Sequence, residues 1–156
     1  MPTDIIEWRN AMKAAIVYAS VHHGNTKKLV DAIAKKYDVT LIDATKTKEQ
    51  DMSSFDLIGF ASGIYFSKYH QSVINFASIN MPQEKDAFLI CTYGGSQGHA
   101  SMEKLLKEKR CKIVGKYGCS GYDTYGPFKL VGGLKKGHPT DDEIAGAVLF
   151  YEGLVK

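Results

Sequence analysis

The sequence contains few cysteines, and they form no recognisable framework. Cys91, Cys111 and Cys119 are an odd number, and no two of them make a CxxC pair. This pattern excludes a disulfide-stapled secreted domain and disfavours a zinc site, so no metal is expected. It is typical of the reduced thiols of a cytoplasmic protein.

Long apolar runs and an excess of one charge are also missing. No stretch approaches the roughly 20 apolar residues of a membrane-spanning helix, and the N-terminus lacks the basic-then-apolar layout of a secretory signal. We therefore expect neither a membrane span nor secretion. A net charge of +3 over 156 residues is too small to indicate a nucleic-acid partner.

The charge is nevertheless unevenly distributed. The basic segment, residues 104–136, carries nine basic and two acidic side chains, whereas the rest of the chain carries eleven basic and fifteen acidic ones. One interpretation is a solvated basic face. The other is a docking surface for an acidic partner or an anionic substrate.

Short apolar runs alternate with amphipathic segments along the whole chain. The runs have the continuous hydrophobicity of strands buried on both faces, as parallel sheets require. The alternation predicts an α/β fold, a three-layer doubly wound sandwich around a five-stranded parallel sheet. Thr140 and Glu143 predict a capping box at the start of the last helix. The expected strands are 14–19, 39–42, 57–61, 87–91 and 112–114.

Ligands of such sheets bind beyond the carboxyl ends of the strands. After the first strand, the stretch SVHHGNT (20–26) leads into a helix, so its backbone N–H groups and hydroxyls favour an anion. It has neither a Walker lysine nor GxGxxG, which favours a single phosphate monoester over a triphosphate or dinucleotide. The alternative is a helix cap with no ligand.

Aromatic residues and glycines follow the third and fourth strands. Tyr65 and Tyr93 could sandwich a flat heterocycle, and Gly63, Gly94 and Gly95 would let the backbone approach its edge. Each tyrosine alone could equally be an ordinary half-buried aromatic. A phosphate loop, an aromatic clamp and a glycine-lined edge in this order together indicate flavin mononucleotide, FMN.

Three stretches resemble the flavodoxin family: AIVYASVHHGNTKKLVDAI, LIGFASGIYFSKYHQSVINF and FLICTYGGSQGH. The resemblance covers Lys13 to Val155. It implies sheet order 2-1-3-4-5, FMN bound without a covalent link, and electron transfer between redox partner proteins such as a flavoprotein reductase or an iron–sulfur protein. It also implies one flavodoxin-like domain at 13–156 behind a short N-terminal extension at 1–12, forming a monomer or weak dimer.

The resemblance assigns residues to the cofactor and none to catalysis. His23 is an extra residue, because the phosphate loop is one residue longer than the family's usual Ser-x-Thr-Gly-x-Thr. Gly63 is the candidate for the peptide that tunes the potential near flavin N5. The phosphate is expected at Ser20, His22, His23, Gly24, Asn25 and Thr26; one side of the ring at Ser62, Gly63, Ile64 and Tyr65; the other side at Thr92, Tyr93, Gly94, Gly95 and Gly98.

Other proteins with this architecture need residues that are absent here. A tyrosine phosphatase requires Cys-x5-Arg, but Gln97 stands where the arginine should follow Cys91. A response-regulator receiver requires an aspartate where Ser62 stands. A domain that keeps the fold but has lost its flavin remains a third, non-catalytic alternative.

A flavin-dependent enzyme is the main alternative to an electron carrier. GIYFSKYHQSVINF also resembles the flavodoxin-like protoporphyrinogen oxidases, and a quinone reductase is a related possibility. In an enzyme, His70 or His99 would donate a proton, and the basic segment would attract an anionic substrate. The acidic surface typical of electron-shuttling flavodoxins is missing, which weakens the carrier interpretation. The alternative for His70 is an ordinary exposed residue at a helix start.

Overall fold

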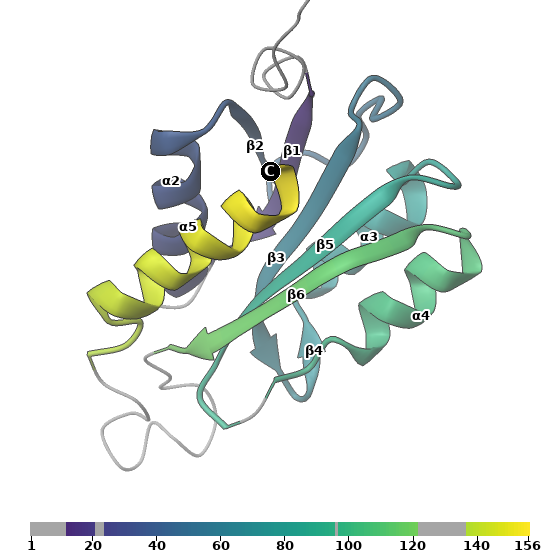
Figure 1. Ribbon diagram of the computed structural model, residues 1–156. Coiled ribbons are helices and arrows are strands. Elements are labelled where there is room, and N and C mark those ends of the chain that lie inside the picture. The colour runs from purple at the N-terminus through teal and green to yellow at the C-terminus, as the bar shows by residue number, and fades with distance from the viewer. Residues whose placement is uncertain (1–11, 21–23, 96, 122–136) are drawn as a thin grey trace, which may run out of the picture.

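The computed structural model describes residues 12–20, 24–95, 97–121 and 137–156. A twisted sheet lies between two helix pairs, with α2 and α5 on one face and α3 and α4 on the other (Figure 1). The strands are β1 (Ala14–Ala19), β2 (Val39–Asp43), β3 (Leu57–Tyr65), β4 (Lys68–Tyr69), β5 (Asp86–Tyr93) and β6 (Lys112–Ser120). The helices are α2 (Asn25–Lys36), α3 (Gln71–Asn80), α4 (Ala100–Glu108) and α5 (Asp141–Val155).

The order of the parallel strands confirms the predicted topology. The sheet runs β2-β1-β3-β5-β6 with parallel pairing throughout. Counted without β4, this is the expected order 2-1-3-4-5. The two-residue strand β4 was not predicted, and it pairs antiparallel with the end of β3.

Two strands continue further than their apolar runs. β3 extends from the expected residue 61 to Tyr65, and β6 extends from residue 114 to Ser120. The added stretch of β3 pairs with β5 and β4, whose hydrogen bonds keep it extended although it carries serine and glycine. Residues expected in a loop after β3 therefore belong to the sheet.

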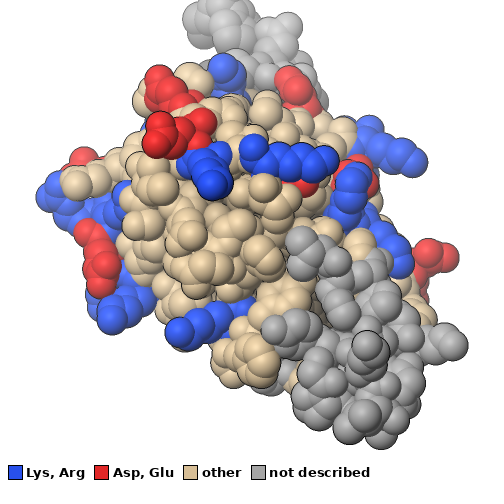
Figure 2. Space-filling model, turned by 180° about the vertical axis from the view of Figure 1, so that it is seen from behind, with Lys and Arg blue, Asp and Glu red and all other residues tan. Residues whose placement is uncertain are grey.

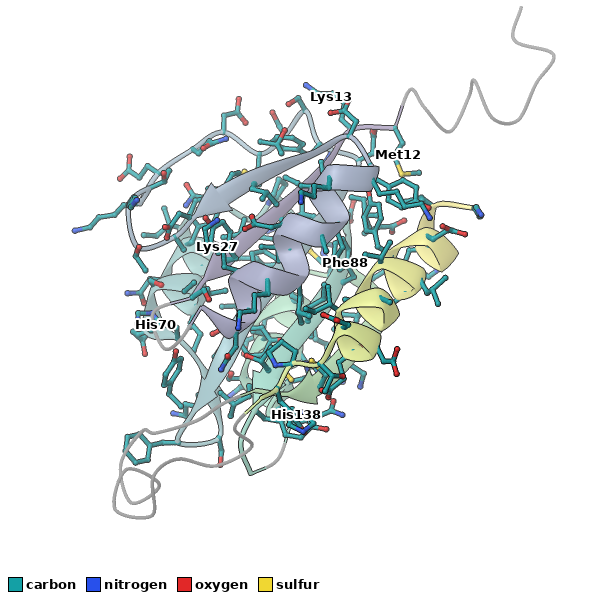
Figure 3. All side chains as sticks on the ribbon, turned by 90° about the vertical axis from the view of Figure 1, so that its left-hand side faces the viewer. Met12, Lys13, Lys27, His70, Phe88 and His138 are labelled. Carbon is teal, nitrogen blue, oxygen red and sulfur yellow. The ribbon has the colours of Figure 1, made fainter. Side chains whose placement is uncertain are left out.

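Both faces of the sheet are packed. On the α5 face, Phe88 lies edge-on to Phe150 and Tyr151, with ring centroids 6.1 and 5.7 Å apart, and Figure 3 shows it between the sheet and this helix. A Cβ on Gly59 would lie 2.2 Å from the Phe88 ring. Glycine on β3 thus makes room for the phenylalanine on β5.

Helix α5 begins at the cap predicted from the sequence. Thr140 and Glu143 form the predicted capping box at the start of α5.

On the opposite face, α3 has the sequence QSVINFASIN, without a charged residue. Figure 2, a view from that side, shows a broad uncharged area with Lys, Arg, Asp and Glu around its margins. Among the described residues, no helix is both long and apolar enough to cross a membrane.

Candidate functional site

A cleft opens at the carboxyl edge of the parallel strands. In Figure 3, His70 and His138 lie toward this edge, and Met12 and Lys13 mark the opposite one. The cleft comprises about 300 Å³ of space not filled by protein atoms, including space open to solvent. Its lining consists of Ser20, Asn25, Thr26, Gly63, Ile64, Tyr65, Thr92, Tyr93, Gly94 and Gly121. All of these except Gly121 were predicted from the sequence.

One side of the cleft, which we call the anion end, is the start of α2. Gly24 has a φ of 67°, a left-handed conformation that glycine adopts without strain. Ser20 Oγ accepts the N–H of Lys27 at 3.0 Å, so its own proton can be donated into the cleft. Asn25 and Thr26 form the first turn, which contains no acidic side chain. The positive end of the helix dipole is therefore available to an anion.

The two predicted histidines of this loop, His22 and His23, lie outside the described residues. Their assignment to the phosphate remains a prediction. Within the described part of the chain, no group of three or more His, Cys, Asp and Glu side chains is arranged to hold a metal ion.

Hydrogen bonds connect the anion end to the neighbouring strands. The hydroxyls of Thr26 and Thr92 lie 3.0 Å apart, with both side chains buried. Gly121 donates its N–H to the carbonyl of Tyr93 at 2.9 Å. A Cβ on Gly121 would lie 2.8 Å from the side-chain amide nitrogen, Nδ2, of Asn25. Glycine just after β6 thus leaves room for the Asn25 side chain, a contact between distant segments that no sequence motif indicates.

The other side, which we call the ring end, consists of the ends of β3 and β5, residues 63–65 and 92–94. Ser62 was expected to line it, but its side chain is fully buried below the cleft. Its Oγ donates to the Gly63 carbonyl at 2.6 Å and accepts the N–H of His70 at 2.8 Å. The His70 ring also lies edge-on to Tyr65, with centroids 5.6 Å apart. The Ser62 hydroxyl therefore holds the backbone of Gly63 and His70 in place beside the cleft.

The β3–β4 hairpin continues the ring end towards solvent. Its turn residues Phe66 and Ser67 have φ values of 50° and 67°, whereas such two-residue turns normally use asparagine and glycine. The Phe66 side chain is 77% exposed. Gly95 and Gly98, both predicted to contact flavin, lie in the β5–α4 loop outside the cleft lining. A Cβ on Gly98 would lie 2.6 Å from the Ser67 carbonyl oxygen, so this loop packs against the hairpin.

A side-chain network behind the ring end, in which Tyr69 and His99 are buried and Gln97 is exposed, was not predicted. Tyr69 Oη lies 2.8 Å from His99 Nδ1, and Gln97 Oε1 lies 2.9 Å from His99 Nε2. Burial, with Lys116 adding to it, lowers the pKa of His99. Both ring nitrogens of His99 have partners within the protein, which argues against this residue as a proton donor. The network joins residues 30 positions apart, so sequence spacing gives no signal for it.

A second hollow lies along α3, outside the cleft. It holds about 870 Å³ of space, much of it open to solvent. His70 borders it, so this ring separates the groove from Tyr65 of the cleft. Its lining consists of Ala44, Thr45, Thr47, Lys48, His70, Ser72, Asn75, Phe76, Ser78 and Ile79.

The basic segment is described only in part, because residues 122–136 lie outside the described residues. On α4, Lys104 and Lys107 are exposed. Lys116 on β6 forms an ion pair with Glu103 at 3.3 Å. The described part therefore offers free cationic surface mainly along α4.

Comparisons with known proteins agree with this architecture. A family profile described as flavodoxin domain matches residues 15–126. A protein of Methanocaldococcus jannaschii, described as uncharacterized protein MJ0298, is 40% identical over 149 residues, covering 93% of this chain and 99% of that protein.

Two solved structures share the fold. A flavodoxin from the domain Archaea superposes with a TM-score of 0.63 at 19% identity, covering 92% of this chain and 99% of that one. Rubredoxin oxygen:oxidoreductase from Desulfovibrio gigas gives a TM-score of 0.70 at 13% identity, covering 92% of this chain and 35% of that one. The profile match spans more than half of the sequence, and with it the predicted resemblance is confirmed: the chain belongs to the flavodoxin family.

Proposed function

We propose that this protein is a cytoplasmic electron carrier that binds FMN without a covalent link and exchanges electrons with redox partner proteins, a flavoprotein reductase or an iron–sulfur protein. In this proposal residues 13–156 are the functional domain and residues 1–12 a short extension. The cleft carries the proposal, because it brings a helix start without acidic residues next to two tyrosines on adjacent strands.

The residues of the cleft suit the two chemically different parts of FMN. The Ser20 hydroxyl and the first turn of α2 would bind the phosphate, together with His22 and His23. Gly63, Gly94 and the peptide groups beside them would contact the ring between Tyr65 and Tyr93. The bound flavin would supply the one- or two-electron redox chemistry.

The protein's own contribution is to bind and orient. The proton of Ser62 Oγ is donated to the Gly63 carbonyl, which fixes the direction of that peptide beside the ring end. The exposed Phe66 on the hairpin turn places an apolar side chain beside the cleft opening. A partner protein docking there would exclude water near the flavin.

The visible spectrum of the purified protein tests the cofactor. We expect yellow protein, or uptake of FMN by the colourless protein on titration. Colourless protein that takes up no FMN would refute the proposal. Reductive titration tests the role: two separate one-electron steps are expected of a carrier.

The groove along α3 favours a second candidate, an FMN-dependent oxidoreductase of the protoporphyrinogen oxidase or quinone reductase type. A substrate lying there would be next to His70, whose ring packs against Tyr65 of the ring end. Rapid turnover of a quinone or porphyrinogen, abolished in His70→Ala with FMN still bound, would support the enzyme over the carrier.

A further inference from the structure

The network behind the ring end has a defined hydrogen-bonding direction. The Oε1 atom of Gln97 can only accept, so His99 Nε2 must carry a proton to bond with it. In the neutral ring, Nδ1 then has the lone pair and accepts from the Tyr69 hydroxyl. Cys91 Sγ lies 3.6 Å from Nε2, and burial raises the pKa of this thiol to about 12, which keeps it neutral.

The same residues attach the β5–α4 loop on two sides. The Gln97 side chain lies against β6, where a Cβ on Gly118 would be 2.5 Å from it. The next residue, Gly98, lies against the carbonyl of Ser67 in the β3–β4 hairpin. Residues 97–99 of the loop are therefore confined between β6 and the hairpin, and His99 connects the two sides through Gln97 and Tyr69.

We propose that His99, as the neutral Nε2–H tautomer bonded to Tyr69 and Gln97, is the positioning residue that fixes the β5–α4 loop against the β3–β4 hairpin and so sets the width of the ring end. This inference rests on the proposed flavin site and deepens it. Protonation at Nδ1 would replace an acceptor by a donor, and Tyr69 would have to reorient.

The surroundings of His99 keep it neutral at pH 7. It faces Tyr69 from β4, Cys91 from β5, Lys116 from β6 and Glu103 from α4. Burial and the positive charge of Lys116 lower its pKa, and Glu103 opposes them weakly. The ring should therefore become charged only below the ordinary imidazole pKa of about 6.5.

Long-range ¹H–¹⁵N spectra of the flavin-free protein test the tautomer directly. We expect His99 to be neutral with the proton on Nε2 at pH 7, and the amide of the buried Gly98, which bonds to Cys91, to exchange slowly with solvent. A charged ring or an Nδ1–H tautomer would overturn the proposal. Because no flavin is needed, this result does not depend on the proposed function.

Riboflavin affinity tests the positioning role, because this ligand lacks the phosphate and reports on the ring end alone. We expect Tyr69→Phe to weaken riboflavin binding roughly three- to tenfold at pH 7. The wild type should lose affinity below about pH 6.5, and Tyr69→Phe should lose this pH dependence. The matched control is Tyr37→Phe, which removes a tyrosine hydroxyl bonded to Glu152 away from the cleft.

Two conservative variants separate the bonds of His99. His99→Asn keeps an acceptor near Nδ1 but loses the donor to Gln97, whereas His99→Gln keeps a donor near Nε2 but loses the acceptor for Tyr69. Partial affinity in each, below wild type and without the pH dependence, supports the proposal. Wild-type affinity and pH profile in Tyr69→Phe would overturn it, and absence of flavin binding in the wild type would refute the proposed function instead.

Discussion

The anion end and the ring end of the cleft are held in place by different parts of the chain. At the anion end, the backbone of α2 and two hydroxyls, those of Ser20 and Thr26, supply the donors. At the ring end, the β5–α4 loop is held by side-chain contacts centred on the buried His99. A cleft can thus combine one end formed by secondary structure with another that depends on individual side chains.

The difference predicts where substitutions are most harmful. A backbone site tolerates side-chain loss, because peptide N–H groups remain. A loop held in place by side-chain contacts and by closely packed glycines is more sensitive, because a substitution removes or obstructs those contacts.

Gly98→Ala should have the largest effect. The added Cβ would meet the Ser67 carbonyl oxygen at 2.6 Å, so either the loop or the hairpin must move. Overpacking of about 1–3 kcal/mol should weaken FMN and riboflavin alike, roughly tenfold or more. Flavin fluorescence titration measures both. Gly153→Ala in α5, where a Cβ meets nothing within 4 Å, is the control, and equal affinities for the two variants would contradict the packing argument.

Thr26→Ala should act on the phosphate alone. Loss of one donor to a charged group should weaken FMN roughly tenfold while changing riboflavin little. Thr92→Ala is the matched control, since it removes the same bond between the two hydroxyls without removing the donor on α2. Isothermal titration with both ligands measures the ratio, and a similar FMN-to-riboflavin ratio in the two variants would refute the assignment.

The ring end should also make stability depend on pH. The pKa of His99 is lowered in the folded protein, so the unfolded chain binds the proton more readily. Stability from this group is therefore complete above about pH 6.5 and is lost as the pH falls towards the lowered value. Thermal unfolding at pH 8, 7, 6 and 5 should show a larger loss for the wild type than for His99→Asn. Parallel curves would show that His99 does not titrate as stated.

The smallest effect should come from the surface outside both ends. Reversing Lys104 and Lys107 on α4 should slow reduction by an acidic partner about two- to threefold at low salt and little at high salt, because surface charges are screened. Reversing the exposed Lys28 and Lys35 on α2 is the control. Equal effects of the two double variants would mean that α4 is only a solvated face.

The start of α2 at the anion end could be predicted from the sequence for a physical reason. An apolar run followed by SVHHGNT and an amphipathic helix is a local pattern, and α2 begins within it at Asn25. The sheet order also followed, because βα units of this family connect in a fixed way.

The ring end depends on contacts between segments far apart in sequence. The apolar run of β3 ends at Ala61, so the strand's continuation to Tyr65 through pairing with β4 could not be read from hydrophobicity. Likewise, no local pattern brings Tyr69 to His99, or Gly121 to Asn25. Such contacts appear only once the strands are in register.

The long strand β3 also restricts where residues can be inserted into or deleted from the chain. It carries Gly59 beneath Phe88 and, a few residues later, Gly63 and Tyr65 in the cleft. Side chains alternate between the two faces of a strand. Inserting or deleting one residue between these positions would therefore move every side chain of the cleft segment to the opposite face of the sheet. Relatives should therefore vary in length at the hairpin turn or in the loops at the opposite edge of the sheet, and keep this spacing unchanged.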